Sequence, residues 1–487
     1  MIISKIKESN IDFVTLCFFL FCIELANMIL MGSNLNMVVT IPQIILVLYY
    51  TLSQKLDKAL LWHIVFCVTG CDTNTVDEDV LMVSYHALKL IGPLTISYLL
   101  LGFIWIMSLR RKYNLPKISM FYELRKLFLL LFVSGTLLGI VGVLCLDFSV
   151  QDFIPPFRYM LIAVLYMDVF SRLYTKSFIE KCYLVCVCLL IVTPIATALS
   201  FFLLNISYDY SVFDSFVTTP VFVLIPTLIL FLIFRVDRMQ KTAMIFSLVW
   251  YVALGVSAAR GSQILSTSIA LAIFVWLVYL GEKRNDYVGI SFFKTVLPFI
   301  GIGVFFGVSY MLLGVGKSMS SNKLDQFVSL FSMFGSIGSG TIVLDGVASS
   351  PYIRIAEILN VIDNGLSHPI SLLIGQGYGG YYTDSLGLFT GLDMWNSGAF
   401  SDAAISSGRY GTAHSMYPNA ILFHGLIGFF FILRMGLRYV KNIKYTPLLF
   451  AAFSFLLYSL YYNVPLMTIC IMMLFASECK LNYYTKC

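Results

Sequence analysis

Three side chains next to apolar segments have the chemistry needed for group transfer from a phosphate-bearing donor. Arg260 lies in a turn of small residues, Arg354 lies near the start of a predicted helix, and His414 directly precedes a long apolar segment. Guanidinium groups bind phosphate or pyrophosphate through paired donors. A neutral imidazole can take a proton from a hydroxyl group. The three residues could therefore bind a phosphate or pyrophosphate group and activate a hydroxyl group.

Each of these residues also has a structural interpretation. Arg260 could be an interfacial arginine that reaches lipid phosphate, and His414 could be a hydrogen-bonding residue at the membrane interface. Arg354 could pair with Glu357 on an exposed helix face, since the two stand one turn apart. A charge near the membrane costs a few kcal/mol unless it is paired or hydrated. Function is therefore favoured for Arg260, while both interpretations of Arg354 stay open.

A second set of residues consists of weaker candidates for substrate binding. Its members are Arg158, Gly375, Gly377, Gly379, Tyr417 and Asn419. The amides of the glycine cluster could bind an anion, although a tight turn that needs positive φ is the commoner cause of such glycines. The acidic run Asp77-Glu78-Asp79 could hold a divalent metal or activate a hydroxyl group, but a solvated loop is favoured. Glu24 and Asp168 lie within apolar segments, where helix–helix hydrogen bonding and an ion path both remain open.

Composition places these residues in a membrane protein. The 487 residues are 59% hydrophobic and only 12% charged, whereas soluble proteins carry about 25% charged residues. Apolar runs of about 20 residues, the length of a membrane-spanning helix, recur from Asp12 to Cys479. The expected fold is an all-α polytopic membrane protein with about 14 transmembrane helices. No CxxC pair or His/Cys metal spacing occurs, so neither a disulfide scaffold nor a zinc site is expected. No other metal, cofactor or nucleic-acid partner is expected either.

The charges predict how the chain is oriented. Most lysines and arginines fall in alternate loops, which the positive-inside rule makes cytoplasmic together with both termini. The short third predicted span, residues 59–71, is needed to keep this pattern. A further span is predicted at residues 88–108, and four are predicted between residues 216 and 314, at 216–234, 242–258, 262–281 and 292–314. Residues 1–315 then form spans 1 to 11, residues 316–412 a large external loop, and residues 413–487 spans 12 to 14. Because non-helical backbone cannot face lipid, the large loop must lie outside the bilayer or line a cavity.

Within the large loop, two helices and an irregular stretch are predicted. Residues 324–334 have the spacing of an amphipathic helix, either on the membrane surface or in a small external domain. A second helix opens at Ser349-Ser350-Pro351 and stops at Asn364-Gly365. Its apolar face consists of Ile355, Ile358, Leu359 and Ile362. Residues 368–380 are expected to be irregular and to lead through a polar loop to His414.

The order of these motifs resembles the O-antigen polymerase and O-antigen ligase superfamily of bacterial inner membranes. The resemblance covers about residues 240–436 and rests on the following segments: Ala259-Arg260-Gly261, Arg354 before His368-Pro369, Gly375-x-Gly377-x-Gly379, His414 before Tyr417-Pro418-Asn419-Ala420-x-Leu422, and Gly425-Leu426-Ile427-Gly428. Ala259 replaces the usual serine before the first arginine, and Ser415 replaces the usual asparagine beside the histidine.

The resemblance implies a C-type glycosyltransferase-like bundle that works on the periplasmic side with an undecaprenyl-pyrophosphate-linked oligosaccharide. Arg260 and Arg354 would neutralise the pyrophosphate, and His414 would orient or deprotonate the acceptor hydroxyl. Membrane lipids, a chain-length regulator and a flippase are the expected partners. A polymerase is favoured by the predicted number of spans. The alternatives are a ligase, which transfers glycan to the lipid A core, and a flippase or transporter, which would show inverted repeats and interrupted helices.

Overall fold

The computed structural model describes residues 2–30, 35–69, 85–86, 88–91, 94–116, 119–203, 349–389, 400–414, 416–441, 453, 456–457, 460–461 and 464–484. This part of the chain is mostly helical, as the composition predicts. Several sequence-based predictions fall outside the described residues. They are Arg260, the acidic run at residues 77–79, the helix at residues 324–334, and the four spans predicted between residues 216 and 314.

Helices from the two ends of the chain pack together at one end of the molecule. They are α1 (Ile2–Ile29), α2 (Asn36–Leu52), α3 (Leu56–Thr69), α4 (Ile96–Ser108), α7 (Lys176–Leu203) and α18 (Val464–Tyr484). α1 and α18 both pack against α7, and α2 packs against α3. The short span predicted at residues 59–71 is therefore a helix, α3. Its buried face includes Leu60 and Ile64, as expected for a helix inside a bundle.

Three described helices are long and apolar enough to cross a membrane. They are α5 (Met120–Cys145), α6 (Val150–Arg172) and the first 24 residues of α16 (Met416–Lys441). Ser119 and Ser149 cap α5 and α6 by accepting hydrogen bonds from the Tyr122 and Gln151 amides, which satisfies N–H groups that have no partner within the helix. The chain is thus membrane-embedded by composition and by the helices it forms.

One predicted span begins later than expected. Residues 88–108 were expected to be a single helix, but β1 (Lys89–Ile91) and β2 (Leu94–Thr95) form a short antiparallel hairpin and α4 starts only at Ile96. The sequence between the two strands is Gly92-Pro93. Proline lacks an amide hydrogen and disfavours helical backbone in the residue before it, so the pair disfavours helix at this position.

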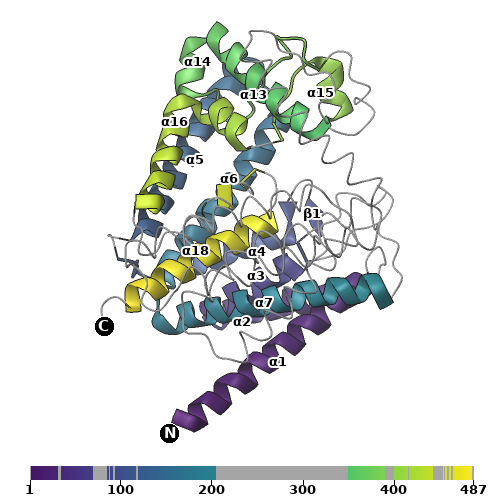
Figure 1. Cartoon of the computed structure of the whole chain (residues 1–487), viewed down its shortest axis with the longest axis vertical. Helices are drawn as coiled ribbons and strands as arrows, with labels where there is room; N and C mark the ends of the chain where they lie inside the picture. The colour runs from purple at the N-terminus through teal and green to yellow at the C-terminus, as the bar shows by residue number, and fades with distance from the viewer. Residues whose placement is uncertain are drawn as a thin grey trace, which may run out of the picture.

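Segments of the large loop gather over one end of α5, α6 and α16, away from α1, α2 and α7 (Figure 1). They are α13 (Ser349–Ser367), α14 (Pro369–Ile374) and α15 (Asp402–Ser407). The helix predicted from residue 349 is present, but it passes Asn364-Gly365 and runs to Ser367. His368-Pro369 ends it, because the residue before proline avoids helical backbone.

The face that α13 buries also differs from the prediction. Ile355, Ile358 and Leu359 are only partly buried and Ile362 is exposed, whereas a neighbouring face bearing Glu357 and Asn360 is fully buried. The apolar spacing predicted the wrong buried face, because hydrogen-bond partners from other parts of the chain satisfy the side chains of Glu357 and Asn360. A buried polar group is tolerated when it is hydrogen-bonded.

Residues 368–380 are not entirely irregular. Pro369 occupies the first turn of α14, where its fixed φ suits a helix and its missing amide hydrogen has no cost. The next residues, 375–380, are called the glycine segment below. Gly375, Gly377 and Gly379 have φ of 87°, 79° and 85°, a region that glycine enters readily. These values fit the interpretation of the cluster as a series of tight turns.

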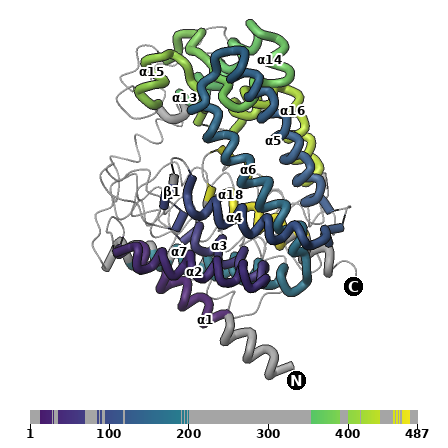
Figure 2. Tube along the Cα trace, turned by 180° about the vertical axis from the view of Figure 1, so that it is seen from behind, coloured from purple at the N-terminus to yellow at the C-terminus, as the bar shows by residue number. Residues whose placement is uncertain are grey.

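The glycine segment docks onto a break in α16. At Gly425 the backbone turns sharply, with φ 66° and ψ −176°, so the carbonyls of Leu422 and Phe423 cannot continue the helical hydrogen-bond pattern. The amides of Gln376 and Gly377 donate to these two carbonyls at 2.8 and 3.1 Å. Figure 2 shows α14 beside α16 at the end of the α5–α6 hairpin. The break is therefore stabilised by the chain segment that follows α14.

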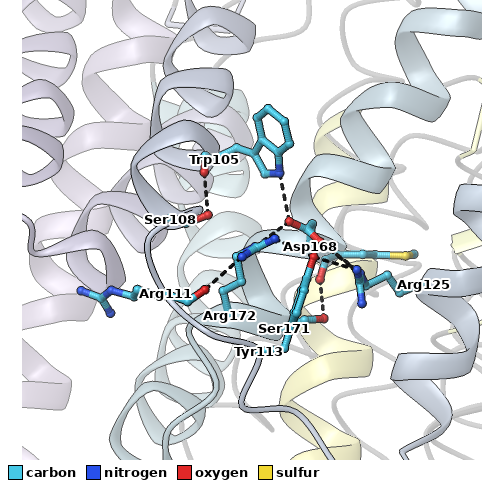
Figure 3. A network of polar contacts seen from close by, with 9 residues as sticks. Trp105, Ser108, Arg111, Tyr113, Arg125, Asp168, Ser171 and Arg172 are labelled. Atoms are coloured by element: carbon cyan, nitrogen blue, oxygen red, sulfur yellow. Dashed lines mark hydrogen bonds and ion pairs between the residues drawn. The ribbon is translucent and has the colours of Figure 1, made fainter. Parts of the chain in front are cut away.

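At the opposite end of α5 and α6, Asp168 organises a closed polar network (Figure 3). Its carboxylate accepts hydrogen bonds from Trp105 Nε1 at 2.9 Å, Tyr113 Oη at 2.7 Å, Arg125 Nε at 3.1 Å and Arg172 Nε at 2.8 Å. Both guanidinium groups also donate to the Tyr113 hydroxyl and stack on its ring. Asp168 therefore acts as a helix–helix hydrogen-bonding partner that ties the loop after α4 to α5 and α6.

Glu24, the other carboxylate predicted within an apolar segment, lies on the buried side of α1. It accepts a short hydrogen bond from Thr193 of α7, and α1 and α7 pack along each other. This contact also joins two helices, which matches the hydrogen-bonding interpretation of Glu24. Its second carboxyl oxygen is buried and has no hydrogen-bond partner among the described residues.

Candidate functional site

The best-defined polar site lies where α13 meets the chain just before α16. Glu357 of α13 is fully buried, with 0% of its side chain exposed, and its Oε1 is 2.6 Å from Nδ1 of His414. The His414 backbone amide also donates to both carboxyl oxygens, at 3.1 and 2.9 Å. Because the carboxylate holds the proton on Nδ1, the basic lone pair of the imidazole is on Nε2. The Glu357–His414 pair therefore has the geometry of an oriented general base.

The imidazole of His414 is accessible although its partner is not. Its side chain is 35% exposed, and one edge meets the ring of Phe400 at a centroid distance of 5.1 Å. Phe400 packs in turn on Tyr410. A buried carboxylate behind a half-exposed imidazole allows a substrate to reach the ring while the orienting charge stays out of water.

Tyr382 completes the hydrogen bonding of the buried carboxylate. Its hydroxyl donates to Glu357 Oε1 at 3.3 Å, and its backbone pairs with Tyr410 through an isolated bridge. Burial, followed by the neighbouring Glu357 charge, raises the pKa of Tyr382. The hydroxyl group therefore keeps its proton throughout the working pH range and remains a donor.

The loop that carries Tyr382 is held on α13 by two asparagines. Asn364 Oδ1 accepts from both the amide and the hydroxyl of Thr383, at 3.1 and 2.9 Å. Asn360 Nδ2 donates to Asp384 at 2.9 Å, and Asp384 accepts from the Leu388 amide. These bonds fix the position of Tyr382 relative to Glu357, so one face of α13 supports the whole site.

Asn419 supports His414 from the other side. Its Oδ1 accepts from the Ala413 amide and its Nδ2 donates to the Ala413 carbonyl, both at 2.8 Å. Asn419 is buried in the first turn of α16 and thus fixes the residue directly before His414. Tyr417 is exposed and meets Phe429 edge to face. Of these two substrate-binding candidates, Asn419 is placed to position the histidine and Tyr417 is placed on the surface.

Arg354 and Glu357 do not form the exposed ion pair considered from their spacing. Arg354 is exposed whereas Glu357 is fully buried, and no ion pair of the described residues joins them. Arg354 is therefore exposed on α13, three residues before the carboxylate that orients His414. Arg158 is placed on α6, where its guanidinium group lies over the rings of Tyr98 and Tyr159.

The candidate glycines have an evident role in the backbone. An added Cβ at Gly375 would meet the Phe423 carbonyl, and at Gly377 it would meet the backbone of α5. The amides of Gln376, Gly377 and Tyr378 already donate to carbonyls of α16 and α5. The close approach of these backbones explains the glycines.

Sequence reasoning missed the roles of Glu357 and Tyr382. Glu357 was considered only as a partner of Arg354, because the two are close in sequence. One signal was present, since Ile353, Glu357 and Val361 share one helix face through their i,i+4 spacing. A carboxylate between two apolar residues on one face indicates a buried charge with a distant partner. Tyr382 gave no comparable signal.

Comparisons with protein-family models, with curated proteins and with solved structures found no match for this chain.

Proposed function

We propose that this protein is a surface-polysaccharide polymerase of the O-antigen type in the bacterial inner membrane. It would transfer a growing glycan from undecaprenyl pyrophosphate to a new lipid-linked repeat unit on the periplasmic side. The observation that carries this proposal is the contact between His414 and the buried Glu357. An imidazole oriented by a carboxylate is suited to take a proton from a sugar hydroxyl.

In the proposed reaction, Nε2 of His414 accepts the proton of the acceptor hydroxyl while that oxygen bonds to the anomeric carbon of the donor sugar. The bond between the anomeric carbon and the pyrophosphate oxygen breaks, and the leaving group keeps the electron pair. Glu357 stabilises the imidazolium that forms. Arg354, and Arg260 as predicted from the sequence, neutralise the charge that develops on the pyrophosphate.

The placement of charges supports a single outward-facing site. The loop helices, including α13 with Glu357, lie over one end of α5, α6 and α16. The Asp168 network lies at the other end of the α5–α6 hairpin, because it joins Arg125 near the start of α5 to Asp168 near the end of α6. Arg438 near the end of α16 pairs with Glu123 near the start of α5, so the basic ends of these helices meet on one side. This fits a cytoplasmic basic end and a periplasmic loop, and the total of about 14 spans remains a prediction from the sequence.

A transporter is a second candidate, because one observation favours it. Transporters often have interrupted helices near the centre of the membrane, and α16 is interrupted at Gly425, which the sequence did not suggest. However, the carbonyls freed by the break accept hydrogen bonds from Gln376 and Gly377. They are thus engaged by the protein itself, and the polymerase remains the favoured function.

The test is complementation of a strain that lacks the gene, with polysaccharide chain length observed on a gel. His414→Ala and Arg354→Ala should abolish chain elongation and leave lipid core capped with at most one repeat unit. His368→Ala is the matched control, since His368 lies in the same loop and its side chain hydrogen-bonds the Asn364 carbonyl near the end of α13. Immunoblots of membranes would show equal amounts of each variant.

A full ladder from both site variants would overturn the assignment of His414 and Arg354. Core that carries no sugar unit at all in the gene-deletion strain would instead favour a ligase or a flippase.

A further inference from the structure

The contacts of the glycine segment place it far from either end of α5. The uncharged stretch of α5 and its following residue runs from Leu127 to Leu146, between Lys126 and Asp147, and about 20 such residues span the hydrocarbon core. The amide of Tyr378 donates to the carbonyl of Gly135 at 2.9 Å. Gly135 lies about 12 Å along the axis from Leu127 and about 16 Å from Leu146. The glycine segment therefore meets α5 near the middle of its apolar stretch.

The surface of α5 that contacts the glycine segment contains two glycines, Gly135 and Gly139. An added Cβ at Gly135 would meet the Tyr378 ring, and at Gly139 it would meet the Tyr378 backbone. Tyr378 is fully buried, with its ring edge-on to Phe153, Phe157 and His424. The irregular backbone is thus enclosed between α5, α6 and α16, which is the condition under which such backbone is tolerated at membrane depth.

The outer surface of the same region is strongly apolar. Ile370, Leu373 and Ile374 of α14 are 74%, 51% and 43% exposed, and Leu366 at the end of α13 is 64% exposed. This patch adjoins α16, because an added Cβ at Gly425 would meet the Leu373 backbone, and the next two residues of α16 are also exposed and aliphatic. An apolar patch continuous with a lipid-facing helix indicates contact with hydrocarbon rather than with water.

We infer that residues 366–379 form a re-entrant element that enters the bilayer from the side of the large loop. Its exposed aliphatic side chains contact the hydrocarbon of that leaflet, and its glycine segment reaches inward to α5 and α16. The basis is the apolar length of α5, the contacts of the glycine segment and the exposure of α14, and none of these depends on the proposed glycosyl transfer. Of the two alternatives for the large loop, outside the bilayer or lining a cavity, residues 366–379 depart from the first.

The test places a tryptophan at selected positions of the full-length protein in vesicles whose phospholipids carry bromine on the acyl chains. The chain has five native tryptophans, so the signal is the difference between each variant and the parent protein. Ile370→Trp should be quenched by the brominated lipids to the same extent as Leu137→Trp, which marks the exposed face of α5. Ser406→Trp on the exposed surface of α15 should be quenched by aqueous iodide instead.

Ile374→Trp gives a second measurement on the same patch in case the first variant does not fold. If both α14 variants respond to iodide and not to brominated lipid, as Ser406→Trp does, the segment lies in water and the inference is wrong. Chain elongation assayed in parallel separates the two proposals, since the quenching result does not depend on activity.

Discussion

Replacing the buried carboxylate with a carboxamide, as in Glu357→Gln, tests whether His414 works as an oriented base. Glu357 accepts hydrogen bonds from Nδ1 and the amide of His414 and from the Tyr382 hydroxyl. A glutamine has nearly the same shape but offers one acceptor oxygen and one NH₂ donor. If the NH₂ group faces Nδ1, the imidazole must accept there and its proton moves to Nε2. The nitrogen that should receive the substrate proton is then already protonated.

The size of the effect follows from comparable arrangements. The corresponding change from carboxylate to carboxamide in a catalytic triad lowers kcat about 10⁴-fold through the wrong tautomer. At ~1.4 kcal/mol per tenfold change, this is about 5 kcal/mol of transition-state stabilisation. Folding should change far less, by ~1–2 kcal/mol, because the glutamine still accepts from the His414 amide. Activity should therefore fall much more than stability does.

The assay is the initial rate of polymer formation by purified protein with lipid-linked repeat units, with thermal unfolding measured on the same preparations. Glu357→Asp should restore part of the rate, since it keeps the charge. Asp402→Asn, in the first turn of the external helix α15, is the matched control and should leave the rate unchanged. Wild-type turnover by Glu357→Gln would refute the view that this carboxylate orients the catalytic imidazole.

Three further predictions concern the supporting structure. Gly139→Ala forces a methyl group against the backbone of the glycine segment and should lower stability by ~1–3 kcal/mol. The control Gly102→Ala, with nothing within 4 Å of the added Cβ, should leave stability equal or higher. Equal melting temperatures for the two variants would contradict the close contact. Asp168→Asn leaves two mostly buried guanidinium groups without their carboxylate and should lower stability by ~3–5 kcal/mol. Glu123→Gln removes an exposed ion pair and should lower stability by only ~0–1 kcal/mol. Both changes are measured by thermal unfolding in detergent. Tyr382→Phe removes one donor to the buried carboxylate and should slow polymer formation about tenfold, the equivalent of ~1.4 kcal/mol. Because burial raises the pKa of Tyr382, the wild-type hydroxyl should keep donating this hydrogen bond up to high pH. An unchanged rate would show that the hydrogen bond is dispensable.

Several features of the fold were predictable because they depend on local composition. The stretches that became α5, α6 and α16 are long and mainly apolar, and a helix satisfies the backbone hydrogen bonds of such a stretch within the segment itself. Pro351 and Ser349 marked the helix that carries Glu357, and His414 was correctly placed before the next long helix. Where the sequence contained a strong local breaker that was overlooked, as at Gly92-Pro93, the predicted span was too long.

The residues of the candidate site were only partly predictable. His414 stood out by type and position, but its partner lies 57 residues away in the chain, so no local pattern could connect the two. The same holds for the break in α16. Gly425 was visible in the sequence, but the amides that satisfy the freed carbonyls belong to residues 46 positions before those carbonyls, and the pairing exists only once the chain has folded.

Composition and the spacing of apolar residues thus determined by themselves that this chain lies in a membrane, forms long helices and carries one polar segment of unusual length. Tertiary structure alone decided which face of α13 is buried, that Glu357 holds His414, and that the glycine segment reaches the middle of α5. The physical reason is the range of the interactions. Helix formation and burial in lipid act on neighbouring residues, whereas a buried carboxylate or an opened helix is stable only when the required donors arrive from elsewhere in the chain.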